Sequence, residues 1–515
     1  MTKQTFIQGT LILIAAGMIT RFLGFINRIV IARIMGEEGV GLYMMAIPTL
    51  VLVITLTHFG LPVAISKRVA EADAKGDITK IKKILLISLA LTCLLSTIFT
   101  IGMILLAPII AQHLLTDERT LYPLLAISPI VPIVAVSAVI RGYFQGRQNM
   151  KPQAYSQVIE QVIRISCVAF FTKAFMPYGV EFAAAGAMIS VVIGELCSLL
   201  FMLNMFQLNK RLNIRYRWIS FIKQSKQTFH ELMSIALPTT GSRLVGSLSF
   251  FFEPILVAQS LAIAGVQTAI ATKQYGELTG FALPLLFLPT FITQSLSVAL
   301  VPNISEANAK NDHSLIHYRI HQAIRLSFAS GAIATVVLVL FSSPILTFMY
   351  GNDHATRLLT IMAPFFLLLY FQAPLQAALQ ALDLAKAAMW NSLIGAFVKF
   401  AVLIALATRP EFGITGVALA IVVGVVLVTL LHFFTLVKAI NFRIKAFDVV
   451  KMISLLVVTW LIGNLLQGIY SDVSSSILSL LSILSLLTLA YTFLLFVFRF
   501  ITKEEIQQLI ATKRK

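Results

Sequence analysis

Long apolar runs separated by short polar connections follow one another along the whole chain. Many of these runs reach the roughly 20 residues that a helix needs to cross a bilayer. The alternation of apolar and polar positions that marks a membrane β-barrel is absent, so helices must satisfy the backbone hydrogen bonds within lipid. The pattern predicts an all-α, polytopic membrane protein with about fourteen transmembrane helices. The expected spans lie near residues 8–32, 40–63, 82–111, 121–141, 155–176, 182–206, 231–260, 276–300, 322–348, 358–382, 387–408, 413–437, 449–470 and 476–499.

A charged heptapeptide occurs twice in the sequence. Glu71-Ala72-Asp73-Ala74-Lys75-Gly76-Asp77 returns 235 positions later as Glu306-Ala307-Asn308-Ala309-Lys310-Asn311-Asp312. The same offset relates Arg164 to Lys399. One offset shared by distant sites indicates two copies of one unit. We expect both heptapeptides to cap helix ends in cytoplasmic loops, in preference to contacting a substrate.

The repeat divides the chain into four parts. Residues 1–207 form an N-terminal six-helix lobe, 208–228 a basic cytoplasmic connector, and 229–440 a C-terminal six-helix lobe. Residues 441–515 add two transmembrane helices and a basic cytoplasmic tail. An even number of spans in each copy makes the repeats parallel, and two such lobes around a central cavity are typical of transporters that work by alternating access.

The charges are few and unevenly placed. The chain is 58% hydrophobic and 12% charged, with a net charge of +18. Most lysines and arginines fall in the termini and in the alternate connections that share a side with them, so the positive-inside rule places both termini in the cytoplasm of a cell-membrane protein. The basic loops also suit contact with anionic membrane lipids. They lack the aromatic or groove-reading elements of a nucleic-acid site, so we expect no nucleic acid partner.

Enzymatic signatures are missing from the sequence. There is no G-x-x-x-x-G-K-[ST] phosphate loop and no G-x-S-x-G motif, and His230-Glu231 lacks the second histidine of a zinc protease. The three cysteines are odd in number and lie in apolar spans, which argues against a disulfide framework. We therefore expect no catalytic residues, metal or cofactor, and this negative evidence favours transport.

Charged residues inside apolar spans are costly in lipid and are candidates for function. Arg21 and Arg28 lie seven residues apart on one face of the first span, a spacing of about 10 Å that suits a diphosphate. The alternative for both is snorkelling to the interface. Glu160 and Arg164 are spaced to form an intrahelical salt bridge, whereas Lys399 has Gly395 in place of that acid.

The seventh span carries two further charges. Arg243 is a candidate substrate contact, and Glu253 a candidate for coupling to a proton or sodium ion where Pro254 breaks the backbone bonding. The alternative for Glu253 is a salt bridge between helices.

Several segments resemble the multidrug/oligosaccharidyl-lipid/polysaccharide exporter superfamily, and within it the sporulation-associated relatives of lipid II flippases. They are GMITRFLGFINR (17–28), GEEGVGLY (36–43), RGYFQG (141–146), LPTTGSR (237–243) and KQYGELTG (273–280). The resemblance implies two bundles around a cationic cavity, a lipid-linked saccharide as cargo and a role in spore cortex peptidoglycan assembly. One cavity arginine of the flippases corresponds to Arg21, while the next falls on Asn27, beside Arg28.

We therefore expect a flippase that moves an undecaprenyl-diphosphate-linked saccharide, with lipid II as the first candidate, to the outer leaflet. Its expected substrate-binding residues are Arg21, Arg28, Arg164, Arg243 and Lys399. The alternatives are a cation-coupled multidrug extruder, which would need a cavity rich in acids, and a non-transporting scaffold of the spore envelope machinery.

Overall fold

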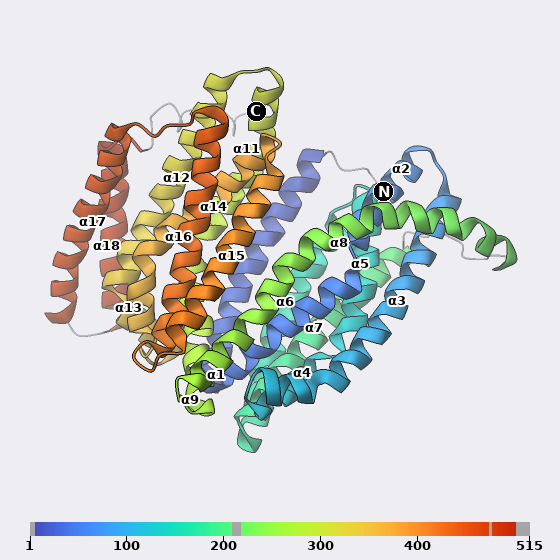
Figure 1. Cartoon of the computed structure of the whole chain (residues 1–515), viewed down its shortest axis with the longest axis horizontal. Helices are drawn as coiled ribbons and strands as arrows, with labels where there is room; N and C mark the ends of the chain where they lie inside the picture. Colours follow the sequence, from blue (N-terminus) through green and yellow to red (C-terminus); the bar gives the residue numbers. More distant parts are fainter. Residues whose placement is uncertain (1–5, 209–217, 473–475, 501–515) are drawn as a thin grey trace. The chain divides into compact units, whose positions relative to one another are not determined.

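The computed structural model describes residues 6–208, 218–472 and 476–500 (Figure 1). Within these ranges all regular secondary structure is helical, which confirms the predicted all-α class. Eleven of the described helices are long and apolar enough to cross a membrane, or up to twelve if a bent helix pair counts as one span. The protein is thus a multi-pass membrane protein.

The chain forms two compact units, Met1–Gly280 and Phe281–Lys515, called unit 1 and unit 2 below. The α-helices of unit 1 are α1 Phe6–His58, α2 Leu61–Ala74, α3 Ile78–Ile109, α4 Leu121–Ile127, α5 Ile130–Gly146, α6 Lys151–Phe175, α7 Val180–Leu208, α8 Trp218–Ile263 and α9 Thr268–Gly276. Short π or 3₁₀ segments are η1 Ile110–Leu114, η2 Glu118–Thr120 and η3 Met176–Tyr178, and η4 Glu277–Ala282 contains the boundary between the units.

The α-helices of unit 2 are α10 Leu283–Phe287, α11 Thr290–Ala309, α12 His313–Leu340, α13 Ser342–Tyr350, α14 Thr356–Ala381, α15 Ala385–Ala407, α16 Gly413–Ile440, α17 Ala446–Asp472 and α18 Ile477–Val497. Figure 1 shows α17 and α18 side by side at one edge of this unit, where α17 packs on α12. These two helices correspond to the last two expected spans, 449–470 and 476–499.

Helix α1 differs from the prediction of two spans joined by a connection. It is 53 residues long and bends at Gly36, whose φ of 66° and ψ of −168° are essentially reserved for glycine. At 1.5 Å per residue such a helix is about 80 Å long, far more than the roughly 30 Å of a hydrocarbon core. Its two halves therefore correspond to the first two expected spans, with a sharp bend instead of a loop between them.

The remaining expected spans match helices to within a few residues at most ends. Helix α6 corresponds to the fifth expected span but is not among the eleven apolar helices. The count of fourteen is consistent with these helices and stays a prediction. So do the repeat boundaries near residues 207 and 229, although α8 and α9 pack with α1 in unit 1.

The duplicated heptapeptide forms the same turn in both copies. Asp77 and Asp312 each accept the backbone N–H of the residue three positions later, at 2.8 and 2.9 Å, and so cap α3 and α12. The preceding residues, Gly76 and Asn311, have left-handed φ values of 68° and 54°. The shared geometry confirms the expected helix-capping role of the two motifs.

Candidate functional site: a charge network in unit 1

Four charged side chains from three helices meet inside unit 1. Arg141 of α5 donates to Glu195 of α7 at 2.8 Å, and its Nη2 lies 3.9 Å from Glu160 of α6. Arg164, one turn further along α6, donates to Glu160. The four side chains are only 5–21% exposed. The network is therefore a largely desolvated array of two positive and two negative charges.

Close packing of α6 against α7 makes this network possible. A Cβ atom at Gly194 would lie 2.9 Å from the carbonyl oxygen of Glu160 and 3.3 Å from Cβ of Arg164. A small residue at this position lets the two backbones approach, as is common between helices in membranes. Gly194 thereby places Glu195 beside the charges of α6.

The network confirms one expected contact and adds another. The intrahelical pair of Glu160 and Arg164 was expected from their spacing, and the structure shows it. The sequence did not predict that Arg141 joins Glu195, because the two residues are 54 positions apart. The sequence did contain one indication of this contact. Glu195 lies in the middle of the apolar helix α7, where a carboxylate needs a cation from another helix to offset its desolvation.

Arg21, Arg28 and Arg243 lie elsewhere in unit 1, and all three side chains are exposed. The charges of Arg28 and Arg164 both lie within electrostatic range of the Tyr43 hydroxyl. Those of Arg243 and Arg141 lie within range of His58, at the end of α1. Three cations from α5, α6 and α8 thus lie within electrostatic range of side chains on α1, which carries Arg28 itself.

Among the described residues, no carboxylate lies within salt-bridge distance of Arg28 or Arg243. Both therefore contribute positive charge beyond the balanced network. In this respect they differ from Arg164, whose charge Glu160 neutralises.

The other expected site residues lie apart from the network. Lys399 belongs to α15 of unit 2, where it is half-buried with its Nζ 4.8 Å from the ring centroid of Phe400. Glu253 is half-buried on α8, and its charge acts on Tyr275 of α9. Helix α8 continues through Pro254, which has no backbone N–H to donate, so the interruption expected there is the loss of one hydrogen bond within an unbroken helix.

A second polar cluster ties the loop after η1 to α1 and α9. Arg119 bridges Asp117 at 2.9 Å and Glu38 at 2.6 Å, and the Thr272 hydroxyl donates to Asp117 at 2.7 Å. Burial raises the pKa of Asp117, but the hydrogen bonds from Arg119 and Thr272 outweigh it and leave that pKa below its ordinary value. This cluster is structural in character because each of its charges has a partner.

Comparison with known proteins places the chain. Residues 6–308 match the model of the family described as "Polysaccharide biosynthesis protein", more than half of the sequence. The chain belongs to the polysaccharide biosynthesis protein family. Residues 278–404 also match the MatE model.

Several relatives of this family member span nearly its whole length. Stage V sporulation protein B of Bacillus subtilis (strain 168) is 57% identical over 509 residues, covering 99% of this chain and 98% of the relative. The lipid II flippase MurJ of the same organism is 25% identical over 84% of this chain and 82% of the relative. The resemblance to the multidrug/oligosaccharidyl-lipid/polysaccharide exporter superfamily is confirmed.

Solved structures share the fold. A lipid II flippase MurJ in an inward closed conformation aligns with a TM-score of 0.67 and 16% identity, over 94% of this chain and 98% of that one. An inward-facing multidrug resistance MATE family transporter aligns with a TM-score of 0.64 and 16% identity, over 82% and 94% of the two chains. The family member is accordingly a membrane flippase or transporter and not an enzyme.

Proposed function

We propose that this protein moves an undecaprenyl-diphosphate-linked saccharide, with lipid II as its first candidate, from the inner to the outer leaflet of the cell membrane. We further propose that it does so by alternating access, with both termini in the cytoplasm, and that it supplies peptidoglycan precursor for the spore cortex. The names of the similar proteins, a stage V sporulation protein and a lipid II flippase, support the choice of cargo and process.

The observation that carries the proposal is the surplus of positive charge around α1. Arg28 and Arg243 are exposed and have no carboxylate partner among the described residues, and Arg21 is exposed on the same side of α1 as Arg28. A diphosphate presents oxygen atoms that guanidinium groups bind in bidentate fashion. The three arginines would hold the head group. The charge network, in which positive and negative charges balance, would hold α5, α6 and α7 together.

The membrane potential would favour the outward step. An anion that leaves an inside-negative cytoplasm gains roughly 2.3 kcal/mol per charge for each 100 mV. A proton or sodium ion bound at Glu253 is a second possible driving force. Lys399, which carries a charge in unit 2, would give that unit a cationic contact of its own for the anionic cargo.

The multidrug extruder is the second candidate because the chain also matches the MatE model. A cationic drug would need acids that are available to bind it. Glu160 and Glu195 are already bonded to arginines, which weighs against this candidate.

A flux assay in vesicles tests the proposal. The full chain is reconstituted with lipid II, and its appearance in the outer leaflet is measured for the wild type and for Arg21→Ala, Arg28→Ala and Arg243→Ala. Each substitution should slow lipid II translocation, whereas Arg357→Ala, an exposed arginine of unit 2, should not. Full translocation by all three variants would remove the cationic site. If none of the substitutions changed translocation, but cells lacking the protein assembled a defective spore envelope, the scaffold alternative would be favoured.

A further inference from the structure

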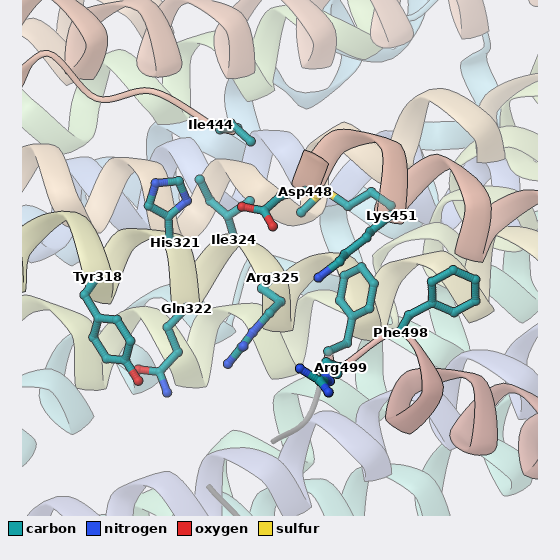
Figure 2. Close-up of a pocket in the computed structure, with 12 residues that line it drawn as sticks. Tyr318, His321, Gln322, Ile324, Arg325, Ile444, Asp448, Lys451, Phe498 and Arg499 are labelled. Atoms are coloured by element: carbon teal, nitrogen blue, oxygen red, sulfur yellow. The ribbon is translucent and has the colours of Figure 1, made fainter. Parts of the chain in front are cut away.

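Unit 2 contains a charged cavity that the proposed transport site does not use. It has a volume of about 180 Å³ and lies between α12, α17 and the turn that follows α18 (Figure 2). Arg325 of α12, Lys451 of α17 and Arg499 line it, and Figure 2 shows their charged ends directed toward the same space. Three helical regions far apart in the sequence thus supply one cation each.

The backbone holds Arg499 in this position. Helix α18 ends in a turn in which the Phe500 N–H donates to the carbonyl of Leu495 at 2.8 Å, and Arg499 adopts a left-handed φ of 57°. Glycine is the usual residue at such a helix end. The Phe500 ring packs on Phe328 with 5.7 Å between centroids and is only 3% exposed, so it anchors the turn. Arg499 is therefore aimed into the cavity by a fixed turn.

The charge of the cavity suits a phosphate group. Among the described residues that line it, Asp448 is the one carboxylate, against the three cations Arg325, Lys451 and Arg499. Tyr318 and Gln322 add polar groups at the other end of the same wall. Two arginines and a lysine around a small volume are typical of phosphate recognition.

An apolar hollow continues from the charged cavity along the outside of α17 and α18. It has a volume of about 440 Å³ and shares Lys451, Phe498 and Arg499 with the cavity. Its remaining wall includes Phe447 and Val497, which are 67% and 57% exposed. The Nζ of Lys451 lies 4.5 Å from the Phe447 ring centroid, at the junction of the two spaces. A soluble phosphate would leave this apolar hollow empty, whereas a phospholipid has an acyl chain that could occupy it.

We propose that the cavity binds the phosphate of an anionic membrane phospholipid, with an acyl chain in the adjoining hollow. The site is separate from the arginines of unit 1 and needs no transported cargo. The basic sequence around residues 438–451 places it at the expected cytoplasmic surface, where anionic lipids are attracted to such segments. The bound lipid would fasten α17 and α18 to α12, the helix of the repeat on which α17 packs.

Lipid binding by the full chain tests this proposal. The detergent-purified protein is titrated with phosphatidylglycerol or with phosphatidylcholine, and bound lipid is counted by native mass spectrometry. The wild type should prefer phosphatidylglycerol. The variant R325Q/K451Q/R499Q should bind it at least about tenfold more weakly, since each lost charge-assisted hydrogen bond is expensive. Lys445→Gln is the matched control, because this exposed lysine lies beside the site without lining it.

A second variant separates binding from folding. Arg499→Gly removes one cation and suits the left-handed turn better than arginine does, so the helix end should keep its structure while phosphatidylglycerol affinity falls. Unchanged affinity in both R499G and the triple variant would overturn the proposal. So would equal loss in Lys445→Gln, which would indicate a diffuse charge effect. Displacement of the lipid by millimolar inorganic phosphate would assign the cavity to a soluble phosphate instead.

Discussion

Replacing Arg141 by leucine removes the cation that connects α5 to the charge network of unit 1. Glu195, whose side chain is 5% exposed, then loses the guanidinium that donates to it at 2.8 Å. Glu160 keeps Arg164 as its partner. The variant therefore holds one buried carboxylate without compensation, beside a second acid.

The expected loss of stability is large. Two unit charges about 4 Å apart attract by roughly 4 kcal/mol at an effective dielectric constant near 20. Breaking a buried pair from one side costs about 3–5 kcal/mol, because the remaining charge stays desolvated. Replacing both partners by leucine should cost much less, since the second acid and its arginine form a neutral pair and apolar side chains pack without a desolvation penalty.

Thermal unfolding of the purified protein in detergent measures this cycle. Arg141→Leu and Glu195→Leu should each lower the midpoint strongly, and the double variant should recover most of the loss. Arg28→Leu, an exposed arginine, serves as the control and should change the midpoint little. Additive losses in the double variant would refute the reasoning, because they would mean that the two side chains do not depend on one another.

Three further predictions concern the rest of the described chain. Asp77→Ala and Asp312→Ala should each destabilise the protein by about 1 kcal/mol in thermal unfolding, since each removes a helix cap; no loss in either would contradict the shared turn. Gly276→Ala should cost about 1–3 kcal/mol because its Cβ would lie 2.0 Å from the Glu37 carbonyl oxygen, whereas Gly102→Ala, with open space around it, should be harmless or stabilising. Because the folded-state pKa of Asp117 lies below its unfolded value near 3.9, its contribution is present above about pH 4 and is lost as the pH falls through the lowered pKa. Asp117→Asn should therefore lower the midpoint at neutral pH and flatten its decline below pH 4, and parallel pH profiles would exclude this role.

The sequence predicts most of the helices because hydrophobic length is a local property. The apolar runs place α14, α15 and α16 to within about two or three residues, and the duplicated heptapeptide predicts two caps. The connection expected between the first two spans was wrong. Gly36-Glu37-Glu38-Gly39 has the composition of a loop, but the helix continues with a single bent position.

The charged sites were only partly predictable. The pair of Glu160 and Arg164 follows from a four-residue spacing on one helix. The contact of Arg141 with Glu195 depends on how α5 and α7 pack, which no local pattern encodes. Arg499 likewise stands at the end of the last expected span, and its place in a cavity depends on the turn that ends α18.

The bend at Gly36 has a consequence for how α1 can fit a membrane. Because the whole helix is far longer than a hydrocarbon core is thick, the bend is what lets both halves lie within one bilayer. A side chain at Gly36 would favour a straight rod that no single bilayer can accommodate. A single backbone position thus allows one 53-residue helix to supply two candidate membrane crossings.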